Sequence, residues 1–310
     1  MSSPSPSAQP PAMSASTWGL LILLGAIWGA SFFFARIAVA EVPPLALVLL
    51  RVSIAAAALQ IYLAVAGPSF AGALPYAGRF FALALLNNVI PFSLIFAGQT
   101  QMGAGLASVL NATTPFWTLI LAQLLTPDER LSPNKITGIV LGIAGTAVMV
   151  GPGVVAGLGG PVWAKMALIG AALSYGFALI LTRRSFTGIA PPLIATGQLT
   201  AATIIMLPVV FFYDGPSALI AGSAGVWASI LALALISTAF AYIVYFRIIA
   251  TAGATNASLV TLLVPVSAML LGATFLGERL ETFELAGMAL IGAGLVVIDG
   301  RLLRLRTRPA

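Results

Sequence analysis

The sequence contains no cysteine and no histidine among its 310 residues. Disulfide bonds, thiolate chemistry and imidazole-ligated metals are therefore excluded, and so is catalysis by a serine–histidine pair. The sequence also lacks the glycine-rich P-loop with which many ATPases bind phosphate. We accordingly expect no enzymatic activity, no ATP-driven step and no resident cofactor or metal.

Charged residues are scarce, at 7% of the chain, whereas a soluble domain carries about 25%. Hydrophobic residues make up 60%, and the mean hydropathy is +1.08. Such a chain cannot cover a globule with polar side chains, and apolar segments long enough to cross a bilayer recur along it. We predict an all-α integral membrane protein with about ten transmembrane helices. They lie near 17–39, 44–66, 77–99, 103–125, 136–150, 163–182, 190–212, 226–249, 255–276 and 283–299.

The two ends of the chain differ from this apolar body. Residues 1–16 are rich in proline and serine and carry no charged side chain, which predicts a disordered tail. They are not a signal peptide, because a basic segment is missing and a full-length span follows directly. Residues 300–310 form a second, basic tail.

An internal repeat divides the chain into two halves. The segment GAGLASVLNATTPFW at 103–117 aligns with GATNASLVTLLVPVS at 253–267. Nearer the start of each half, IWGASFFFAR aligns with SYGFALILTR, which pairs Trp28 with Tyr175. We therefore predict two homologous blocks of five helices. These blocks are 17–150 and 163–299.

Because five is odd, the second block must enter the membrane from the opposite side. Lysine and arginine concentrate in cytoplasmic loops, and a cytoplasmic N-terminus places most of them inside. The outer segments then hold only Arg36, Lys165 and Arg279. The formal charge of +6 is thus a topology signal rather than a nucleic-acid surface, and both termini are expected in the cytoplasm. Inverted repeats are typical of secondary transporters, which bind substrate between the repeats near the bilayer midplane.

Short motifs support a family resemblance. "WG" in the first helix, PPLALVLLR at the start of the second, and "P…ERL" at the ends of the fourth and ninth resemble the drug/metabolite transporter superfamily, EamA type. The resemblance covers nearly the whole chain after residue 16, and within the superfamily it is most similar to YddG-type exporters of aromatic and other amino acids. It implies a multi-pass protein of the bacterial inner membrane that exports small molecules.

Polar residues at midplane depth mark a candidate site. Asn87 and Asn88 lie about ten residues into the third segment, roughly 15 Å along a helix, and the repeat pairs them with Ser237 and Thr238. Such residues either hydrogen-bond helices together or line a wet cavity. We favour substrate binding and include neighbours on the same faces and in the paired helices. The candidate substrate-binding residues are Trp28, Arg51, Asn87, Asn88, Phe92, Gln99, Asn111, Tyr175, Ser237, Thr238 and Tyr242, and the candidate hinges are Pro91, Pro115 and Pro265.

Arg51 lies about seven residues into the second segment, and two readings stay open. Its side chain either snorkels to the interface, the more frequent outcome, or binds a substrate carboxylate or a gate carbonyl. A separate pattern, Gly138, Gly142 and Gly145 with Gly287 and Gly294, predicts close helix packing within the chain or between protomers. We expect a monomer or weak dimer whose other partners are membrane lipid and a small-molecule substrate.

All eight acidic residues fall in loops or at the ends of predicted helices. Transporters of cationic drugs need an embedded carboxylate, so a cavity of amides, hydroxyls and aromatic rings fits neutral or zwitterionic solutes. Amino acids, aromatic ones included, fit this description, with nucleotide sugars, other metabolites or drugs as the alternative and a channel as a remote one. Glu284 and Asp299, near the interfaces, are expected to stay hydrated, so we predict a uniporter; proton coupling is the alternative.

Overall fold

The computed structural model describes residues 14–125, 133–156, 161–252, 257 and 260–299, and its secondary structure within these ranges is helical. Both predicted tails lie almost entirely outside them. The helices of the first half are α1 (Ala15–Ala38), α2 (Pro44–Ala66), η1 (Phe70–Tyr76), α3 (Ala77–Ala84), η2 (Leu85–Val89), α4 (Ile90–Gln99), α5 (Ala104–Asn111), α6 (Thr114–Leu125) and α7 (Pro133–Ala156). Those of the second half are α8 (Val162–Ser185), α9 (Pro191–Tyr213), η3 (Pro216–Leu219), α10 (Ala224–Leu231), η4 (Ala232–Phe240), α11 (Ala241–Ala252), α13 (Val260–Leu276) and α14 (Thr282–Asp299).

Several of these helices are long and apolar enough to cross a membrane. Seven helices or continuous helical runs in the described residues qualify by length and composition, and two shorter apolar helices lie at Leu263–Leu276 and Thr282–Ile298. An all-helical membrane protein is therefore confirmed at this level. The number of ten spans and the inverted relation of the halves stay predictions.

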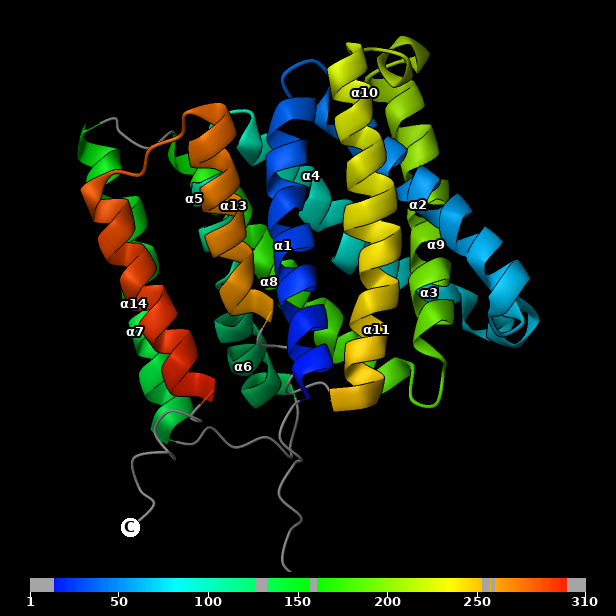
Figure 1. Cartoon of the computed structure of the whole chain (residues 1–310), viewed down its shortest axis with the longest axis horizontal. Coiled ribbons are helices and arrows are strands. Elements are labelled where there is room, and N and C mark those ends of the chain that lie inside the picture. Colours follow the sequence, from blue (N-terminus) through cyan, green and yellow to red (C-terminus); the bar gives the residue numbers. More distant parts are fainter. Residues whose placement is uncertain (1–13, 126–132, 157–160, 253–256, 258–259, 300–310) are drawn as a thin grey trace, which may run out of the picture.

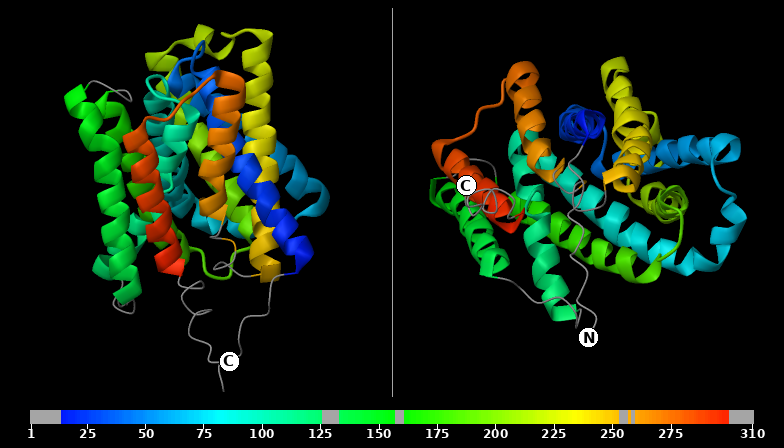
Figure 2. Two further views of the ribbon diagram at one scale, coloured as in Figure 1. Left: turned by 60° about the vertical axis from the view of Figure 1, so that its left-hand side comes forward. Right: turned by 60° about the horizontal axis from the view of Figure 1, so that its bottom comes forward.

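Helices from the two predicted halves pack against one another. α1 contacts α13, α2 contacts α9, and α4 contacts α8, and Figures 1 and 2 show these segments side by side although they are distant in sequence. Their facing sides are apolar, with Leu24 in α1 and Leu199 in α9 among the side chains that are fully buried. Contacts between the halves thus form the centre of the bundle.

The predicted glycine pattern joins α7 to α14, which lie together at one edge of the bundle (Figure 1). A Cβ atom added at Gly294 would lie 2.7 Å from the carbonyl oxygen of Gly138. One added at Gly145 would lie 2.7 Å from the carbonyl oxygen of Gly287. Any larger side chain would push the two backbones apart. Of the two readings left open, the structure shows packing within one chain.

The start of the first described helix, α1, and the end of the last one, α14, lie at the same end of the bundle. α1 begins and α14 ends at the lower end in Figure 1, whereas α10 begins at the upper end. This arrangement agrees with termini on one side of the membrane. That this side is the cytoplasm stays a prediction.

Candidate functional site

A widened helical turn interrupts the middle of the third helical run in each half. In the first half it is the π-helix η2, and in the second half it is the π-helix η4. Pro91 lies two residues after the end of η2 and has no N–H to donate to the carbonyl four residues earlier, which disfavours a regular α-helical turn there. η4 contains no proline; there the hydroxyl of Thr238 donates to the carbonyl oxygen of Leu233 at 2.8 Å. π-turns inside α-helices occur often at functional sites, and these two carry the predicted polar pairs.

Three polar side chains from different elements form a network next to η2. The amide nitrogen of Asn87 donates to the Oε1 atom of Gln198 in α9 at 2.9 Å and to the hydroxyl of Tyr242 in α11 at 3.4 Å. The amide nitrogen of Gln198 also donates to the Tyr242 hydroxyl, at 3.3 Å. The network connects the two predicted halves, since Asn87 belongs to the first and its partners to the second.

Arg51 of α2 reaches the same region from another side. Its Nε atom donates to the hydroxyl of Thr238 in η4 at 2.9 Å, and its guanidinium carbon lies 3.9 Å from the ring centroid of Phe92 in α4. Only 7% of the Arg51 side chain is exposed. The more frequent reading, a side chain that snorkels to the interface, is therefore wrong. Thr238 and the Phe92 ring offer the guanidinium a hydrogen bond and a π face inside the bundle.

Buried amide groups without partners lie beside this network. Asn88 is fully buried and faces the Tyr242 hydroxyl, yet neither its Oδ1 nor its Nδ2 atom makes a hydrogen bond in the described part of the chain. Buried polar groups are nearly always satisfied, so an unpaired amide at this position is a candidate contact for a ligand or water. The central cluster is defined hereafter as Arg51, Asn87, Asn88, Phe92, Gln198, Thr238 and Tyr242.

The other predicted substrate-binding residues lie around the central cluster or apart from it. Tyr175 is close enough to Arg51 and Tyr242 to interact electrostatically with both. The Trp28 ring packs on Tyr245, with centroids 5.4 Å apart, instead of joining the hydrogen-bond network. Ser237 donates to the carbonyl oxygen of Ile27 at 3.1 Å and so holds η4 against α1.

Two predicted amides are not bonded to the central cluster. Gln99 donates to the carbonyl oxygen of Phe32 at 2.8 Å and leaves its own Oε1 atom unpaired. The Oδ1 atom of Asn111 is buried without a hydrogen bond. Of the predicted hinges, Pro115 lies in α6, and Pro265 lies inside α13. Whether either bends during transport stays a prediction.

Sequence reasoning missed Gln198, which is 3% exposed and central to the network. A signal was present. PPL opens the helical segment at 43–45 and again at 191–193, and counting from these prolines places Gln198 one residue short of the position of Arg51. α9 ends beside the start of α2, where Asp214 accepts from Ala46, so the two helices are antiparallel and the two polar residues lie at corresponding positions counted from opposite ends of the bundle.

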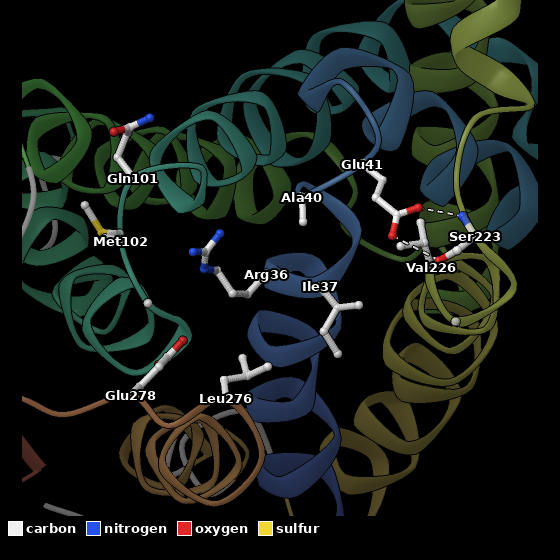
Figure 3. A pocket seen from close by; sticks show the side chains of 12 residues that line it. Arg36, Ile37, Ala40, Glu41, Gln101, Met102, Ser223, Val226, Leu276 and Glu278 are labelled. Atoms are coloured by element: carbon white, nitrogen blue, oxygen red, sulfur yellow. Dashed lines mark hydrogen bonds between the residues drawn. The ribbon is translucent and has the colours of Figure 1, made fainter.

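One crevice lies at the upper end of the bundle, with a volume of about 540 Å³. It is bordered by the end of α1, the α4–α5 connection, the start of α10 and the α13–α14 connection. Arg36 and Glu278 point into it, and Glu41 lies on its far side (Figure 3). A second crevice, of about 580 Å³, is lined by Gln60 and Phe70 among others. The predicted substrate-binding residues line neither, so the cavity predicted between the halves stays a prediction.

At the upper end of the bundle, carboxylates of each predicted half accept hydrogen bonds from the N-termini of helices in the other half. Glu278 accepts from the backbone nitrogens of Ala104 and Gly105 in α5, at 2.8 and 3.1 Å. Glu41 accepts from the backbone nitrogen of Ser223 before α10 at 2.6 Å (Figure 3). In the same way Asp214 accepts from Ala46 in α2 at 3.0 Å. Each contact satisfies free N–H groups and is favoured by the helix dipole.

The expectation that Glu284 stays hydrated near the interface is wrong. It lies in the first turn of α14 and is 2% exposed, so it is buried rather than hydrated. Its Oε2 atom accepts from the backbone nitrogen of Glu281 at 2.9 Å, while Oε1 makes no hydrogen bond in the described residues. Lys165 of α8, 1% exposed, interacts with it electrostatically. The turn position alone could not show that this carboxylate is buried close to Lys165.

Comparisons with known proteins concern the family and the fold of the chain. Residues 16–151 and 162–299 each match the EamA-like transporter family. The "Uncharacterized inner membrane transporter YedA" of Escherichia coli K12 is 27% identical over 91% of this chain and 90% of its own length. The "Probable amino-acid metabolite efflux pump" of Salmonella typhimurium is 28% identical over 92% of this chain and 95% of its own length. A crystal structure with 20% identity superimposes with a TM-score of 0.66, covering 96% of this chain and all of the other, and shows a shared fold.

Proposed function

The chain belongs to the EamA-like transporter family, and from this premise we propose that it exports amino acids, aromatic and other neutral ones, or related small metabolites. The export proceeds by alternating access through a central cavity between the two repeats, and the chain works as a uniporter. It is a multi-pass membrane transporter; the substrate, the mechanism and the direction are the proposed part.

One observation carries the proposal: the hydrogen-bond network of Asn87, Gln198 and Tyr242. It joins the two halves, and it lies among aromatic rings with the unpaired amide of Asn88 beside it. An amino acid with an apolar side chain has this combination of polar and apolar parts. The efflux pump from Salmonella typhimurium, a relative at 28% identity, is named for an amino-acid metabolite, which supports the same substrate class.

A uniporter is favoured because the central cluster contains no carboxylate and the chain contains no histidine. Proton-coupled carriers use a titratable group inside the membrane that changes its protonation during the cycle. Arginine does not serve, because its guanidinium stays protonated. Glu284 supports the second candidate, proton-coupled export, since it is buried and has one unpaired oxygen. Its place in the first turn of α14, outside the central cluster, makes it the weaker candidate.

The proposal is tested with purified protein in liposomes that are loaded with labelled amino acids, nucleotide sugars or cationic dyes. We expect release of phenylalanine and other neutral amino acids down their own gradients, and little release of the dyes. Asn87→Ala should reduce this release about tenfold, because it removes an amide that contacts two partners. Gln60→Ala is the matched control, since Gln60 donates a similar 3.0 Å hydrogen bond to Thr200, outside the central cluster.

Two results would overturn the proposal. In the first, only nucleotide sugars or dyes leave the liposomes. In the second, Asn87→Ala and Gln60→Ala lower amino-acid release equally, which would make the network a packing feature. Continuous ion current through the protein in a planar bilayer would show a channel instead of a carrier.

A further inference from the structure

Arg51 is a buried cation that has no acidic partner within the part of the chain that the structure describes. Its side chain is 7% exposed, and its single hydrogen bond within the described residues is the one from Nε to the Thr238 hydroxyl. Its other contacts are the faces of Phe92 and Phe96, whose centroids lie 3.9 and 5.8 Å from the guanidinium carbon. A guanidinium has five N–H donors, so the two terminal nitrogens are left with their donors unused. No described carboxylate neutralises the charge of the guanidinium.

Four of the described carboxylates make contacts elsewhere in the bundle. Glu41, Asp214 and Glu278 bind helix amino ends at the upper end of the bundle. Glu284 accepts from the backbone at the start of α14. A charge inside a membrane protein is retained where it binds something, because a buried unpaired ion is unfavourable. The buried charge of Arg51 therefore has no neutralising anion among the described residues.

The groups around Arg51 supply hydrogen-bond donors in excess. The two amides of Asn87 and Gln198 both donate to the Tyr242 hydroxyl, which leaves the hydroxyl proton for another acceptor. The amide of Asn88 is fully buried near the same hydroxyl and makes no hydrogen bond of normal geometry among the described residues. A planar anion with two oxygens would satisfy the fork of Arg51 and could accept from these groups as well.

The upper crevice contains another arginine, Arg36. Arg36 points into it, while the carboxylates of Glu41 and Glu278 that border it are bonded to helix amino ends (Figure 3). Arg36 lies nine residues beyond Ile27, whose carbonyl bonds Ser237 next to the central cluster. This separation is about 14 Å along α1. The upper crevice therefore places one arginine and two helix-bound carboxylates at this end of the bundle.

We propose that Arg51 binds the carboxylate of the transported molecule and that the α-amino group is not required. This inference rests on the proposed export function and narrows its substrate class to monocarboxylates with an apolar part, of which amino acids are one kind. The central cluster has a cation for the carboxylate and no anion for an ammonium group. The carboxylate lies on the fork of Arg51 with Asn88 as a further donor, and the apolar part lies against the aromatic rings.

Four compounds with one phenyl group separate the two charges. They are phenylalanine, 3-phenylpropionate, which lacks the amino group, and phenylalanine amide and phenethylamine, which lack the carboxylate. With the purified chain in liposomes we expect phenylalanine and 3-phenylpropionate to be transported at rates within about fivefold of each other. The two compounds without a carboxylate should be transported at least about tenfold more slowly, as loss of a bidentate charged contact requires.

Variants at Arg51 test the same point independently. In Arg51→Gln the preference for the carboxylate compounds should disappear, and Arg51→Lys should restore part of it, because it keeps the charge without the fork. Gln60→Ala serves as the control and should keep the full preference. If a variant does not fold, the four-compound comparison on the unaltered chain still decides. Equal transport of phenylalanine and phenylalanine amide, or an unchanged preference in Arg51→Gln, would overturn the proposal.

Binding measured without transport distinguishes this inference from the proposed function. Each compound is added to the detergent-solubilised protein, and the shift in its melting temperature is recorded. If the carboxylates stabilise the unaltered chain but not Arg51→Gln, while no amino acid is transported, the Arg51 site stands and the export of amino acids falls. If amino acids are transported and carboxylates give no shift that depends on Arg51, the export stands and this inference falls.

Discussion

Replacing Glu278 by glutamine should loosen the contact between α5 and the α13–α14 connection. The carboxylate accepts two backbone hydrogen bonds, from Ala104 at 2.8 Å and Gly105 at 3.1 Å, at the amino end of a helix from the other half. Glutamine keeps one acceptor oxygen and loses the charge. One charge-assisted bond and part of the helix-dipole interaction are then lost, about 1–2 kcal/mol for a half-buried site.

This change predicts a measurable opening of the upper crevice. Met102, which is 5% exposed, lines the crevice next to α5. The chain has no native cysteine, so Met102→Cys provides a single reporter for a membrane-impermeant maleimide. If labelling requires local opening, about 1–2 kcal/mol raises the open population, and hence the labelling rate, about 5- to 30-fold.

The control for this experiment lies three residues away. Glu281 has an exposed side chain, so Glu281→Gln makes the same chemical change without touching α5. We expect it to alter labelling of Met102→Cys by no more than about twofold. The reasoning is refuted if Glu278→Gln leaves the labelling rate unchanged, or if both variants accelerate it equally.

Three further predictions concern other parts of the bundle. In the central cluster, Asn87→Ala and Gln198→Ala should each lower amino-acid release. The free-energy loss in the double variant should be smaller than the sum of the two single losses, because the two residues share one hydrogen bond. Additive losses would argue against a shared network. In α14, Gly294→Ala should lower thermal stability by about 1–3 kcal/mol, since its Cβ would meet a backbone oxygen at 2.7 Å. Gly292→Ala should leave thermal stability unchanged, because a Cβ atom added there has no other atom within 4 Å. Melting curves compare the two variants. An imposed pH gradient should not concentrate a neutral amino acid in liposomes, in the unaltered chain or in Glu284→Gln; concentration that is abolished by Glu284→Gln would establish proton coupling through that carboxylate.

Composition was sufficient for the class of protein, and the place of the polar residues along their helical runs could be counted from the sequence. A chain with 60% hydrophobic and 7% charged residues has to place most side chains in lipid or in a buried core, which allows few folds. Helical rise along an apolar segment then sets the depth of Asn87 or Thr238 without knowledge of any neighbour. The π-turns that carry these residues were not predicted, although Pro91 indicated a local irregularity in the first of them.

Contacts between distant segments decided the rest. Arg51 points inward, where Thr238, far away in sequence, accepts its hydrogen bond, and Glu284 is buried with Lys165 of α8 close to it. The binding of Glu278 to the amino end of α5 likewise depends on two chain segments that meet only in the folded bundle. A sequence pattern gives the position of a side chain along its own helix. The direction that a long side chain takes depends on which donor, acceptor or ring the neighbouring helix presents, and only the tertiary structure determines that.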